Sequence, residues 1–164
     1  MNKFAQIFTI ILIFGVFFAF TASAQEGTVW TKNDLQNMYM EVLREEGYLP
    51  AIDEDGDILF KVSGSNYYII INESEPRFFR IYRGVSLGSF LPEDAIAIAN
   101  DLNMYSMVAK VYISSDRKSA AINTELLLPE PQDFRPVFKR AISLMMFAEN
   151  NFFDQLRDRS APAP

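Results

Sequence analysis

The sequence predicts an α+β domain in which an antiparallel sheet of about five strands packs with three helices, in the order α-β-β-β-α-β-β-α. Several short segments alternate apolar and polar residues and are separated by turns rich in Gly, Asp and Ser, as is typical of antiparallel strands. Three other segments carry apolar residues at helical spacing. The chain has 164 residues and is 49% hydrophobic, which suffices for one packed core.

The first helix is predicted over residues 32–46. Thr31 is suited to the N-cap position, and Asp34 occupies the acidic position of a capping box three residues later. Gly47 follows as the expected stop. The apolar face of this helix consists of Leu35, Met38, Tyr39 and Val42, with Leu43 beside it.

Strands are predicted next. The short segment Ala51-Ile52 leads into an acidic turn at 53–57, and residues 58–63 then alternate apolar with polar. After a turn at 63–66, strands are expected at 67–72 and 78–83, and Gly84 is expected to open a loop.

The second half is predicted to consist of a helix, two strands and a last helix. Pro92 suits the first position of a second helix, with Ala95, Ile98, Ala99 and Leu102 on its apolar face. Strands follow at 108–114 and 119–128. A long last helix is expected to end near Leu156. If Asp133 is its N-cap, Pro136 lies in a distorted first turn, where no helical hydrogen bond is lost.

Composition excludes several functions. The chain has no Cys and no His, so it cannot form a Ser-His-Asp triad, a thiol nucleophile, a disulfide or a His-rich zinc site. Its net charge of −6 argues against binding a nucleic-acid backbone. We expect no cofactor and no enzymatic activity.

The N-terminus has the pattern of an export signal. A basic start at Lys3 precedes a 17-residue, almost entirely apolar run over 4–20, and Ala22-Ser23-Ala24 supplies small residues for signal peptidase. We therefore expect residues 1–24 to be a cleaved signal peptide, followed by a linker over 25–30, the domain over 31–157 and a disordered tail over 158–164. A retained membrane anchor is the alternative, but spanning takes about 20 residues. Export would place the mature protein in the periplasm or outside the cell, without stable membrane insertion.

Several segments resemble the YbjN-type family of proposed bacterial sensory transduction regulators. The resemblance covers about residues 31–157, in the same order. It lies in Glu45-Glu46-Gly47-Tyr48, in 52–61, in Phe78-Phe79-Arg80, in 108–112, and in Pro131, Asp133 and Phe134. It departs from the family at Glu130, where a Ser or Thr cap is commoner. The resemblance implies a fold like that of type III secretion chaperones, small α+β proteins that usually dimerise and hold extended partner segments, and it implies no catalytic residues.

The acidic turn could be interpreted as a metal site. Asp53, Asp55 and Asp57 alternate as Ca²⁺ ligands do, but the sixth position of the loop is Ile58 and the twelfth is Gly64. Asp55-Gly56 instead predicts a tight turn. We therefore expect a turn and no metal site. A hydrolase that uses paired carboxylates is a remote alternative.

One face of the sheet is a candidate binding surface. If Ile58, Phe60 and Val111 face the helices, and if Phe79 and Ile81 also point inward, the alternation places a mixed basic and aromatic set on the opposite face. This set consists of Lys61, Arg80, Tyr82, Lys110 and Tyr112. It could bind an extended acidic or apolar segment, or it could be a solvated face whose long side chains cover apolar neighbours.

The last helix is the second candidate surface. Residues 141–148 are apolar except for Ser143, and seven such positions surround most of a helix. This pattern predicts that the helix packs on its own sheet and also on a second subunit or ligand segment; the alternative is a helix buried within its own subunit. The expected partner residues are Ile142, Met145, Met146 and Phe153.

The sequence thus predicts an exported, non-enzymatic protein-binding domain, chaperone-like or regulatory, that forms a homodimer. The alternative function is a periplasmic module that binds a small apolar ligand between sheet and helices.

Overall fold

The computed structural model describes residues 29–160 of the chain. The predicted signal peptide and most of the predicted linker lie outside this range. The elements have the predicted order, and their bounds are α2 (Lys32–Glu45), β1 (Ala51–Ile52), β2 (Ile58–Val62), β3 (Ser65–Ile69), β4 (Phe78–Ser86), α3 (Pro92–Tyr105), β5 (Ala109–Ile113), β6 (Ser119–Leu127), the 3-10 turn η1 (Pro131–Asp133) and α4 (Phe134–Ser160).

The six strands form one antiparallel sheet in the order β1-β2-β3-β4-β6-β5. About five strands were expected, and the two-residue β1 accounts for the sixth. Strands that are consecutive in the sequence are also adjacent in the sheet, except for β4 and β5. The chain passes from β4 through α3 to the edge strand β5, and β6 then fills the position between β4 and β5.

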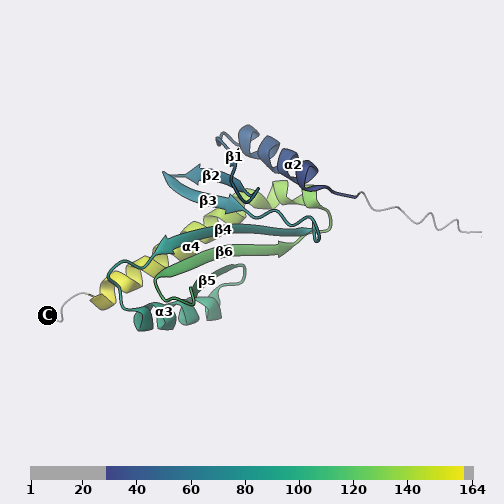
Figure 1. Cartoon of the computed structure of the whole chain (residues 1–164). Helices are drawn as coiled ribbons and strands as arrows, with labels where there is room; N and C mark the ends of the chain where they lie inside the picture. Colours follow the sequence, from purple (N-terminus) through teal and green to yellow (C-terminus); the bar gives the residue numbers. More distant parts are fainter. Residues whose placement is uncertain (1–28, 161–164) are drawn as a thin grey trace, which may run out of the picture.

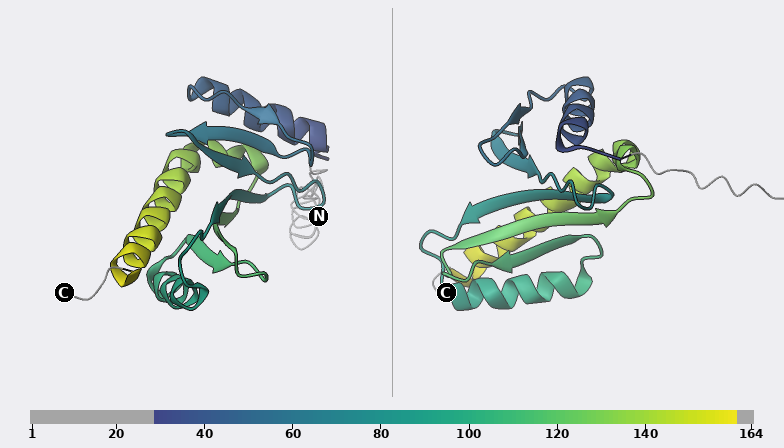
Figure 2. Two further views of the ribbon diagram at one scale, coloured as in Figure 1. Left: turned by 60° about the vertical axis from the view of Figure 1, so that its left-hand side comes forward. Right: turned by 45° about the vertical axis from the view of Figure 1, so that its right-hand side comes forward.

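The helices lie to one side of the central strands. Helix α4 runs diagonally behind β4 and β6, with α2 near β1 and β2 at one end of the sheet and α3 beside β5 at the other (Figure 1). Two further views show the same arrangement, with no helix across the front of β4 and β6 (Figure 2). The core therefore lies between α4 and the rear face of the sheet.

The N-terminus of α2 is capped as predicted. The Thr31 hydroxyl accepts a hydrogen bond from the Asp34 amide at 3.2 Å, and the Asp34 carboxylate accepts one from the Thr31 amide at 3.0 Å. The Thr31 hydroxyl also donates to the Asp34 carboxylate at 2.6 Å, and this bond, followed by the one from the Thr31 amide, lowers the pKa of Asp34. Gly47 follows the helix at φ +86°, a conformation that favours glycine.

Two turns differ from expectation. Ser63 and Gly64 have φ values of 49° and 82°, so a two-residue turn joins β2 to β3, and β3 begins two residues earlier than predicted. Strand β4 continues through Gly84 to Ser86, although Gly84 was expected to open a loop. The hydroxyl of Tyr82 lies over Gly84, where an added Cβ would be 3.1 Å from it. Glycine therefore makes room for Tyr82 inside the strand.

Helix α4 begins with the expected distorted turn. Asp133 is the last residue of η1, where its carboxylate accepts a hydrogen bond from the Glu130 amide at 3.0 Å. Helix α4 begins at Phe134, and Pro136 lies in its first turn. The helix continues past Leu156 to Ser160, which includes residues expected in the tail. Arg159 contacts Asp94 at 3.4 Å at this end.

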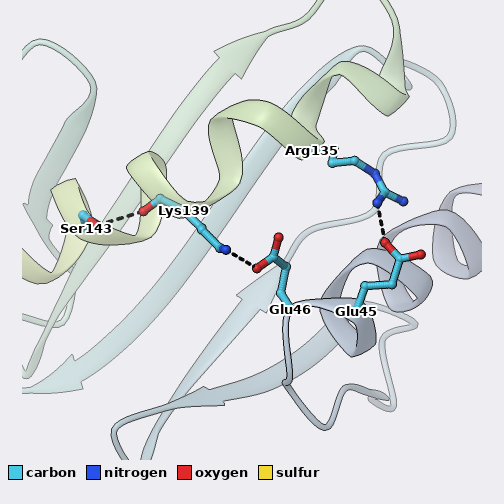
Figure 3. Close-up of polar contacts among 5 residues, drawn as sticks. All are labelled: Glu45, Glu46, Arg135, Lys139 and Ser143. Carbon is cyan, nitrogen blue, oxygen red and sulfur yellow. Dashed lines mark hydrogen bonds and ion pairs between the residues drawn. The ribbon is translucent and has the colours of Figure 1, made fainter.

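Ion pairs join α2 to the start of α4. Arg135 pairs with Glu45, and Lys139 Nζ lies 2.6 Å from a Glu46 carboxylate oxygen (Figure 3). The contact with Glu46 raises the pKa of Lys139. The same view shows the Ser143 hydroxyl donating to the Lys139 carbonyl at 2.9 Å. The two ion pairs thus link the C-terminus of α2 to the first turns of α4.

The core is aromatic at the α2 end. The rings of Tyr39 and Phe134 have centroids 4.5 Å apart, and those of Phe60 and Phe138 lie 5.8 Å apart. Because these rings come from α2, β2 and α4, the core holds the first and last described helices together through β2. None of the helices within residues 29–160 is long and apolar enough to cross a membrane.

Candidate functional site

The structure places the predicted partner residues of α4 in or against the chain's own core. Ile142 and Met145 are buried, and Met146 and Phe153 are partly buried and pack on the core. The rings of Phe153 and Phe90 have centroids 6.3 Å apart. The predicted surface is therefore corrected: these four side chains belong to the side of α4 that packs on the chain's own core, and the exposed residues of α4 lie on its other side.

One large apolar side chain of α4 is exposed in the described part of the chain. Phe147 is 67% exposed, whereas its neighbour Met145 is fully buried. Phe147 borders a hollow of about 420 Å³ between α3, β5 and α4, which we call the α3–α4 groove. Its lining includes Leu102, Tyr105, Met107, Arg140, Leu144 and Phe147.

The groove arises because α3 and α4 diverge. The two helices meet where Arg159 contacts Asp94, and from there they separate toward the C-terminus of α3 (Figures 1 and 2). Residues at that end and just past it project from the surface, with Tyr105 82% and Met107 93% exposed. Together with Phe147, they form an apolar rim on an otherwise acidic protein.

Polar contacts hold this rim in place. The Asn103 side chain donates to the Val111 carbonyl at 2.7 Å and accepts from the Val111 amide at 2.9 Å. Lys110 donates to the Ser106 carbonyl at 2.8 Å, a favourable position for a cation at a helix C-terminus. Asn103 thus occupies backbone groups on the edge strand β5, which opposes pairing of a further strand there.

The predicted sheet-face residues are only partly brought together. Arg80 reaches across β6 and donates to the Tyr112 hydroxyl at 3.1 Å, and its guanidinium lies 5.6 Å from the Tyr82 ring centroid. Lys110 lies in the same row as Tyr82 but donates to the Ser106 carbonyl. Lys61 is on β2, separated from β4 by β3.

An acidic residue that the prediction omitted changes the charge of this face. Glu125 lies opposite Arg80, with Arg80 Nε 3.2 Å from its carboxylate, and it accepts a hydrogen bond from Asn123 at 2.6 Å. The alternation of β6 already places Glu125 on the face of Asn123 and could have identified it. Because Glu125 offsets Arg80, the face is less basic than predicted, and its binding role stays a prediction.

The acidic loop has the geometry of a turn. The carboxylate of Asp53 accepts from the amides of Asp55 and Asp57 at 3.0 and 2.9 Å, and the carboxylate of Asp57 accepts from the Ile71 amide at 2.8 Å. Desolvation raises the pKa of Asp57, and the Ile71 bond partly opposes this shift. These carboxylates serve the backbone, and within the described range no cluster of three potential metal ligands occurs.

A larger hollow of about 710 Å³ lies between the β3–β4 loop and the end of β6. Its lining mixes Trp30 and Leu127 with the charged residues Glu75, Arg77 and Glu130. The α3–α4 groove is the more uniformly apolar of the two and is bordered by exposed apolar side chains. It is therefore the stronger candidate for an apolar occupant.

Comparison with known proteins supports the fold alone. No family model matches the sequence, and no curated protein matches it. An uncharacterized protein from Methanothermobacter thermautotrophicus is structurally similar with a TM-score of 0.58 at 13% identity, over 77% of this chain and 99% of that one. YbjN of E. coli, described as a proposed transcription regulator, has a TM-score of 0.53 at 9% identity, over 68% of this chain and 86% of that one. The chain thus has a YbjN-like fold.

Proposed function

We propose that this chain is an exported, non-enzymatic binding domain that holds an apolar protein segment in the α3–α4 groove. The observation that carries the proposal is the rim of exposed Tyr105, Met107 and Phe147 around a hollow. Contiguous exposed apolar surface on a soluble domain commonly marks an interaction site. The YbjN-like fold supports a regulatory or chaperone-like role, and we propose that the chain is a YbjN-type protein.

The groove suits a helical or extended protein segment. It lies between two helices, the usual setting for a helix-in-groove contact, and burying its rim would gain about 25 cal/mol per Å² of apolar area. Met107 lies at the open end, and methionine adapts to partners of different shape. Arg140 supplies a charge at the edge that can orient the occupant.

A small apolar ligand is the second candidate. The hollow of about 420 Å³ falls within the range of small-molecule sites. It lies between sheet and helices, the position expected for the alternative function.

Site-specific photo-crosslinking separates the two candidates. A photoreactive residue at Met107 should form adducts of discrete protein mass in cells, and Phe147→Asp should abolish them. The same residue at Leu49, equally exposed at the opposite end of the sheet, is the matched control and should form none. Adducts of only a few hundred daltons would favour the small ligand, and no adduct at Met107 would contradict both candidates.

Export rests on the sequence alone and has a direct test. Mass spectrometry of protein purified from cells that express the whole chain should give a mass that begins at Gln25. An intact Met1 would contradict signal cleavage.

A further inference from the structure

We propose that the protein seated on the α3–α4 groove is a second copy of this chain, with the two α4 helices antiparallel across a two-fold axis at Phe147. This inference rests on the proposed function, because it names the occupant of the same groove. It uses Phe147, Arg140 and Asp154 in place of the buried residues that the sequence suggested.

The first argument is the exposed stripe of α4. Arg140 is seven residues before Phe147 and Asp154 is seven residues after it, and all three are exposed. Seven residues make nearly two helical turns, so the three side chains lie within about 40° of one line along the helix. The two charges lie about 10.5 Å on either side of the aromatic ring.

The second argument is charge complementarity. When two identical helices pack antiparallel about Phe147, Arg140 of each copy lies beside Asp154 of the other. The stripe is therefore complementary to itself in this one direction, whereas parallel packing would place like charges together. Among the described residues, Arg140 takes part in no ion pair, and Asp154 pairs only with Arg157, in an exposed contact of the weak kind.

The third argument is shape. A two-fold interface uses the same patch on both copies, so it needs a projection and a hollow side by side. Phe147 projects beside the hollow lined by Leu102, Met107 and Leu144. The Phe147 ring of each copy can therefore enter the hollow of the other. The edge strand β5 is a poor alternative route to a dimer because Asn103 occupies its backbone.

Charge reversal tests the orientation. Protein purified from cells that express the full chain should have twice the mass of one chain by light scattering. Arg140→Asp or Asp154→Arg alone should weaken the dimer at least about tenfold, because each creates two repulsive contacts. The double variant should recover to within about threefold, because it restores both pairs with reversed signs. Glu41→Arg, an exposed change on α2 that alters the net charge as Asp154→Arg does, should leave the mass unchanged.

Some outcomes would overturn the proposed dimer and still be consistent with the proposed function. A single-chain mass at about 100 μM, well above typical dimer dissociation constants, would overturn it. So would a double variant as weak as the single ones. If the photoreactive residue at Met107 then links to a different protein, the groove is a protein-binding site but its occupant is not a second copy. If it links to no protein, both proposals fail.

Discussion

Arg83 and Glu149 form an ion pair, with Nε and the carboxylate oxygen 2.8 Å apart, that joins the centre of the sheet to the middle of α4. The side chains are only 14% and 16% exposed. The Tyr67 hydroxyl donates to the same oxygen at 3.2 Å, and the Arg83 guanidinium lies 5.1 Å from the Tyr67 ring centroid. This cluster links the middle of α4 to strands β3 and β4.

Removing one partner of this pair should destabilise the fold. Arg83→Met leaves Glu149 largely buried without its cation, and we expect a loss of about 2–3 kcal/mol in the free energy of unfolding, measured by urea denaturation. The control is Arg159→Met in the more exposed pair with Asp94, where the loss should stay below about 1 kcal/mol. Equal losses in the two variants would show that the burial of the Arg83–Glu149 pair does not increase its contribution to the free energy of unfolding.

The same cluster predicts a loss of stability in alkali. Burial, and to a lesser degree the Glu149 charge, raises the pKa of Tyr67 to about 12 from an ordinary value of 10.0. Between these values the unfolded chain has lost the phenol proton and the folded chain retains it, so rising pH favours unfolding. The free energy of unfolding should therefore fall from pH 10 to 12. Tyr67→Phe should fall less steeply in the same titration, and a parallel fall would contradict the assignment.

Asn103 should protect the edge of the sheet. Asn103→Leu keeps the approximate volume of the side chain but leaves the Val111 amide and carbonyl without their partner. We expect a cost of about 1–3 kcal/mol in unfolding free energy and faster hydrogen exchange at the Val111 amide. Asn100→Leu on the same helix, at an exposed position, is the control and should change neither. Unchanged exchange at Val111 in the Asn103 variant would refute the role.

Truncation of two phenylalanines of α4 should reduce stability by very different amounts. Phe152 is fully buried, so Phe152→Ala should cost about 3–5 kcal/mol of stability through the cavity it leaves. Phe147 is mostly exposed, so Phe147→Ala should cost less than about 1 kcal/mol when it is made in the Arg140→Asp background and measured at a concentration where light scattering gives the mass of one chain. Thermal unfolding of the two variants measures both losses of stability. A large loss at Phe147 would mean that its ring stabilises the single chain and is not held ready for a partner.

Local signals in the sequence predicted much of the fold. The Thr31 cap, the alternation of β2 and the placement of Pro136 each depend on residues within one turn or one strand, and the structure confirms them. Gly84 was misplaced because its role depends on the Tyr82 ring, which folds back over the strand. A glycine alone does not distinguish a loop from a strand with a close side-chain contact.

The candidate site was harder to predict because it depends on distant contacts. The apolar pattern of residues 141–148 does not reveal that α4 crosses the full sheet, so Met145 and Phe147 look alike in the sequence. The Arg83–Glu149 pair joins residues far apart in the chain, and neither has a local signature. A signal for the groove did exist in Met104-Tyr105-Ser106-Met107, an apolar run just after a predicted helix.

The position of β6 makes the order of synthesis matter. Strands β4 and β5 both pair with β6, yet β6 is made after both of them. A growing chain that has not reached Ser119 therefore contains two strands whose common neighbour does not yet exist. Such a chain can pair β1 to β4 with one another, but it can place β5 in the sheet only after β6 has been made.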